Sequence, residues 1–121
     1  MRPAFDLGIR IAIQNAGFQP IRTDADIDIG RIDARIISEI RRSRFVVADV
    51  TEQRQGVYFE AGFAIGIEVP VFWCIRRDDL LNVHFDTRQY NHLIWSSYAQ
   101  LASDLEDRIT AVIGVHSRLV K

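Results

Sequence analysis

The sequence predicts an α/β fold in which helices flank an open parallel sheet. Two short segments, FVVADV (45–50) and VPVFWCI (69–75), are almost continuously apolar, as is typical of strands covered on both faces. Segments with helical periodicity alternate with these strands, and this alternation favours parallel pairing through right-handed crossovers. With 121 residues, 48% of them hydrophobic and 26% charged, the chain fits a single globular domain over 1–121.

Residues 3–43 are predicted to form two helices separated by a strand and a loop. The first helix is expected over 3–16, with Gly17 ending it and one apolar stripe formed by Phe5, Gly8, Ile9, Ala12, Ile13 and Ala16. A short strand over 18–22 and an aspartate-rich loop over 23–28 follow. The second helix, over 29–43, has Asp28 as its N-cap and an isoleucine face made of Ile29, Ile32, Ile36, Ile37 and Ile40.

The remaining elements follow the first buried strand. A polar loop over 51–55 leads to a helix over 56–67, in which small residues allow close packing on a sheet: Ala61, Gly62, Ala64 and Gly66. The strand over 69–75, a charged loop over 76–88 and a short strand over 92–95 come next. A final helix, capped by Ser96 or Ser97, runs to about 113 before Gly114, with Tyr98, Leu101, Leu105, Ile109 and Val112 inward.

Folds of this kind normally begin with a strand, whereas this chain begins with a helix. We therefore expect a sheet that lacks its N-terminal strand. Such a sheet leaves backbone edges and apolar faces uncovered, which native proteins rarely tolerate. This predicts a homo-oligomer, in the simplest case a dimer.

Charge and composition argue against several functional classes. The chain has 15 Lys and Arg against 16 Asp and Glu, a net charge of −1, so no basic excess favours duplex nucleic acid or an anionic membrane. No apolar run reaches the ~18 residues of a membrane span. No Cys/His cluster has the spacing of a zinc site, and we expect neither a metal nor a cofactor. The single Cys74 excludes an internal disulfide, and the N-terminal residues lack a signal-peptide pattern, so a cytoplasmic protein is expected.

Two carboxylates are the main candidates for catalysis. Glu60 is the only charged residue between Arg54 and Glu68, and it lies in the first turns of its helix, where the helix dipole favours a carboxylate. The alternative is a simple helix-terminal charge. Asp33 falls within the isoleucine face of the second helix, where it either enters the site or forms a buried salt bridge with an arginine.

Other polar residues follow the strand ends, the edge at which open α/β sheets bind ligands. Asp49 either contacts a ligand or caps the turn after its strand. Arg22 and Asp24 either bind a ligand or pair with each other. Tyr58 either lines the pocket or packs in the core.

The run IIxEIRRSRFVVADVT, then GVYFEAGFAIG, and HFDTRQYNHLIW further on resembles the nucleoside 2-deoxyribosyltransferase-like family, which is related in fold to the TIR domains. The resemblance extends from about residue 5 to residue 113 and implies a flavodoxin-like or Rossmann-like three-layer fold. It implies that Glu60 attacks the anomeric carbon of a nucleoside and that Asp33 assists. The residues that we expect to bind the substrate are Arg22, Asp24, Asp49, Thr51, Gly56 and Tyr58.

The expected function is therefore cleavage of the N-glycosidic bond of a nucleoside or nucleotide, or transfer of its deoxyribosyl group. A carboxylate can stabilise or covalently capture the oxocarbenium-like state of such a reaction. Arg54 stands where many transferases of the family carry an acidic residue, and the first strand is missing. The alternative is accordingly a TIR-like nucleotide-binding or NAD-cleaving signalling module without transferase activity.

Overall fold

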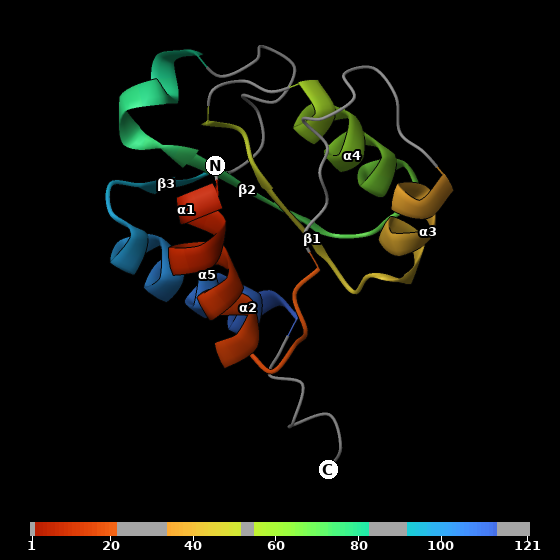
Figure 1. Ribbon diagram of the computed structural model, residues 1–121, viewed down its shortest axis with the longest axis horizontal. Helices are drawn as coiled ribbons and strands as arrows, with labels where there is room; N and C mark the ends of the chain where they lie inside the picture. Colours follow the sequence, from red (N-terminus) through yellow and green to blue (C-terminus); the bar gives the residue numbers. More distant parts are fainter. Residues whose placement is uncertain (1, 22–33, 52–54, 83–91, 114–121) are drawn as a thin grey trace. The chain divides into compact units, whose positions relative to one another are not determined.

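The computed structural model describes residues 2–21, 34–51, 55–82 and 92–113 (Figure 1). It contains a sheet of three strands in the order β1-β2-β3, with bounds Val46–Asp49, Val71–Arg76 and His92–Trp95. β1 and β2 pair in parallel from Val46↔Val71 to Asp49↔Cys74. The predicted α/β class with an open parallel sheet and flanking helices is confirmed.

The chain divides into two compact units, Thr23–Ile94 and a second unit made of Met1–Arg22 and Trp95–Lys121. The first of these contains most of the sheet together with α3 (Ala34–Arg42), α4 (Gln55–Gly66) and the 3-10 helix η3 (Arg77–Asn82). α4 packs on β1 and β2 and also contacts α3.

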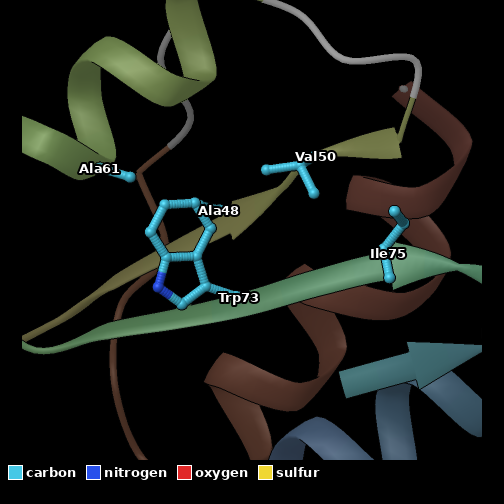
Figure 2. Packing of buried hydrophobic residues seen from close by; sticks show 5 residues of the cluster. All are labelled: Ala48, Val50, Ala61, Trp73 and Ile75. Atoms are coloured by element: carbon cyan, nitrogen blue, oxygen red, sulfur yellow. The ribbon is translucent and has the colours of Figure 1, made fainter. Parts of the chain in front are cut away.

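The core of the unit 23–94 lies between α4 and the sheet. Ala61 of α4 lies on the same side of the strands as the Trp73 ring (Figure 2), and they pack together with Ala48, Val50 and Ile75. The small side chain of Ala61 lets the helix approach the strands closely, which is the packing that the alanines and glycines of this segment predict.

The other unit is built from helices. α1 (Arg2–Ala4), the π-helical turn η1 (Phe5–Ile9) and α2 (Arg10–Asn15) follow one another without a break and pack against α5 (Tyr98–Val112). The predicted stripes are largely confirmed, since the buried residues include Gly8, Ile9, Ala12, Ile13, Ala16, Leu101, Leu105 and Ile109. Ser97 is the N-cap of α5, and its Oγ accepts a hydrogen bond from the Gln100 N–H (3.1 Å).

Several local predictions are wrong. Residues 18–21 form no strand, because Gly17 turns the chain with φ 95° and the Phe18 N–H donates back to the Ile13 carbonyl (3.1 Å). Residues 77–82, expected as loop, form η3, in which acidic residues occupy the favourable first turn. Tyr98 and Val112 are exposed rather than inward, since both lie at the ends of α5, where fewer residues surround them.

Other boundaries move slightly or lie outside the described residues. α4 begins at Gln55, one residue earlier than predicted, and β2 spans Val71–Arg76 where a strand over 69–75 is predicted. On α3, Ile40 is buried while Ile36 and Ile37 are partly buried. The expected N-cap Asp28, the helical residues 29–33 and Gly114 lie outside the described residues. Within the described ranges, no helix combines the length and the apolar character that crossing a membrane requires.

Candidate functional site

Glu60 lies on the buried side of α4. Val57, Glu60, Ala61 and Ala64 recur at helical spacing, and all four are buried or partly buried. Glu60 retains 8% of its surface exposed, and its Oε2 has almost no exposed area. A carboxylate is thus placed beside the apolar cluster around Ala61, where ionisable groups are costly unless they are paired or used.

Two further buried polar residues lie at the end of the neighbouring strand β1 and just after it. Asp49, the last residue of β1, is 8% exposed, and Thr51 is fully buried. The Thr51 N–H donates to Asp49 Oδ1 (2.8 Å), and Thr51 Oγ1 accepts a hydrogen bond from the Arg76 N–H (2.9 Å). Asp49 therefore does cap the turn after its strand, and the Thr51 hydroxyl joins the carboxyl ends of β1 and β2. Ligand contact by either residue stays a prediction.

These buried polar side chains share one region of the fold. Asp49, Thr51 and Glu60 are the buried polar or charged residues within the described ranges, and all belong to the β1–α4 connection or its flanks. α4 starts six residues after the end of β1 and packs on that strand (Figure 1). The first turns of α4 therefore stand near the carboxyl edge of the sheet, where ligands of such sheets bind.

A carboxylate that sequence reasoning overlooked is Glu39 on α3. Its Oε1 is buried and makes no hydrogen bond to the described residues, while its Oε2 lies 3.8 Å from Arg35 Nε. α3 contacts α4, so Glu39 and Glu60 are carried by neighbouring helices. The sequence could have indicated Glu39, because it lies among the isoleucines Ile36, Ile37 and Ile40. The same reasoning singled out Asp33.

Tyr58 belongs to a separate aromatic group. Its ring centroid lies 6.4 Å from that of Trp73, whose centroid is 5.6 Å from that of His92. Tyr58 thus packs against the core cluster, the second of the two alternatives for this residue. Because Tyr58 and Glu60 are two residues apart on a helix, their side chains leave α4 in different directions. The His92 contact was not predicted, since nothing local to the sequence joins β2 and β3.

The remaining candidates contribute less to the observed geometry. Gly56 is the second residue of α4. Arg22, Asp24 and Asp33 lie outside the described residues, so their predicted roles stay predictions. The described ranges contain no group of three or more His, Cys, Asp or Glu side chains placed to hold a metal ion. Comparisons with family models, curated proteins and solved structures gave no match to this chain.

Proposed function

We propose that this chain cleaves the N-glycosidic bond of a nucleoside or nucleotide, or transfers its deoxyribosyl group to another base, with Glu60 as the nucleophile. The observation that carries the proposal is the burial of this carboxylate on α4, the helix that follows β1 and packs on it. The motif around Glu60, GVYFEAG, supports the same assignment through its family resemblance. We further propose the cytoplasm as the compartment, since a lone buried cysteine suits a reducing environment.

The chemistry needs one ionised carboxylate facing an anomeric carbon. A Glu60 oxygen attacks that carbon while the C–N bond breaks, and the bonding electron pair leaves with the base, which takes up a proton. The transition state has oxocarbenium-like charge, which a nearby carboxylate stabilises. Attack by water on the resulting glycosyl ester frees the sugar, restores the carboxylate and releases a proton. A second base in place of water gives transfer.

Other residues assist Glu60 or hold the substrate in the proposed reaction. Asp33 assists the carboxylate, and Arg22, Asp24, Asp49, Thr51 and Gly56 contact the substrate.

The test is release of free base, measured by chromatography, from a panel of nucleosides, 2-deoxynucleosides and nucleotides. Glu60→Gln keeps the size of the side chain and removes the nucleophile, so we expect base release to fall by at least about 10³-fold. The matched control is Glu68→Gln, which changes an exposed carboxylate just beyond the other end of the same helix and should leave activity unchanged. A 2-deoxy-2-fluoro nucleoside should leave a glycosyl group on the peptide that contains Glu60, detected by mass spectrometry.

Two outcomes would contradict the proposal. One is absence of base release from every substrate in the panel. The other is equal release by the wild type and by folded Glu60→Gln. Nucleotide binding in calorimetry without base release would instead favour a TIR-like binding module.

A further inference from the structure

We draw no further inference here: the strongest candidate, the Glu39 side chain on α3 with its buried Oε1, pairs with Arg35 through its other oxygen, and no hydrogen bond or ion pair joins it to a described residue of α4, so nothing in the described part of the chain points to a ligand for it.

Discussion

Substituting Gly8 tests how tightly the helical unit is packed. A Cβ built on Gly8 stands 2.7 Å from Leu101 Cδ2, 3.0 Å from its Cγ and 3.3 Å from its Cβ, and Leu101 is fully buried. Movement of Cδ2 alone would not remove the contacts with Cγ and Cβ. Overpacking of this kind costs about 1–3 kcal/mol, while alanine gains about 1 kcal/mol over glycine in a helix. Gly8→Ala should therefore destabilise the protein by about 1 kcal/mol.

Gly62→Ala supplies the comparison that separates packing from helix propensity. No described atom lies within 4 Å of its added Cβ, outside the helix backbone and chain neighbours, so the same substitution should stabilise the fold by up to about 1 kcal/mol. The free energies of unfolding of the two variants should then differ by about 1–3 kcal/mol, the packing cost alone. Urea denaturation followed by far-UV circular dichroism measures both. A Gly8→Ala protein as stable as Gly62→Ala would refute the packing argument.

Three further substitutions test contacts that support the fold, each through the free energy of unfolding. Thr51→Val removes the acceptor of the Arg76 N–H and should lower the free energy of unfolding by about 1–3 kcal/mol. Thr51→Ser keeps the hydroxyl and should lower it by less. Equal losses of stability in the two variants would argue against the hydrogen bond. Leu105→Ala opens space at a fully buried site and should cost about 2–5 kcal/mol; a loss below 1 kcal/mol would mean that the site closes up. Ser97→Ala removes the cap on the Gln100 N–H and should cost about 1 kcal/mol, and an unchanged midpoint would contradict it.

The sequence predicted most of the described helices and strands because apolar runs and helical periodicity lie within single segments of the chain. The apolar runs around Val47 and Phe72 contain strands of the sheet, and the 3.6-residue stripe of Ile9, Ala12 and Ile13 marks a helix. The expected strand after Phe18 failed because the end of a helix competed for the same residues. The Phe18 N–H was used by the preceding helical turn and did not enter a ladder.

The sequence by itself determined the α/β class, most of the helices and strands within the described ranges, and Glu60 as an isolated carboxylate on an apolar helix. The tertiary structure decided which surroundings each side chain has. Apart from Glu60, α4 is apolar around most of its circumference, so its sequence does not say which face meets the sheet. Packing of α4 on its neighbours buried Glu60 and left Phe59 exposed. The partial burial of Glu39 and the Thr51–Arg76 hydrogen bond likewise join residues from separate elements. Periodicity places a residue on a face of its own element, but burial and pairing depend on a second segment, and only folding brings that segment into contact.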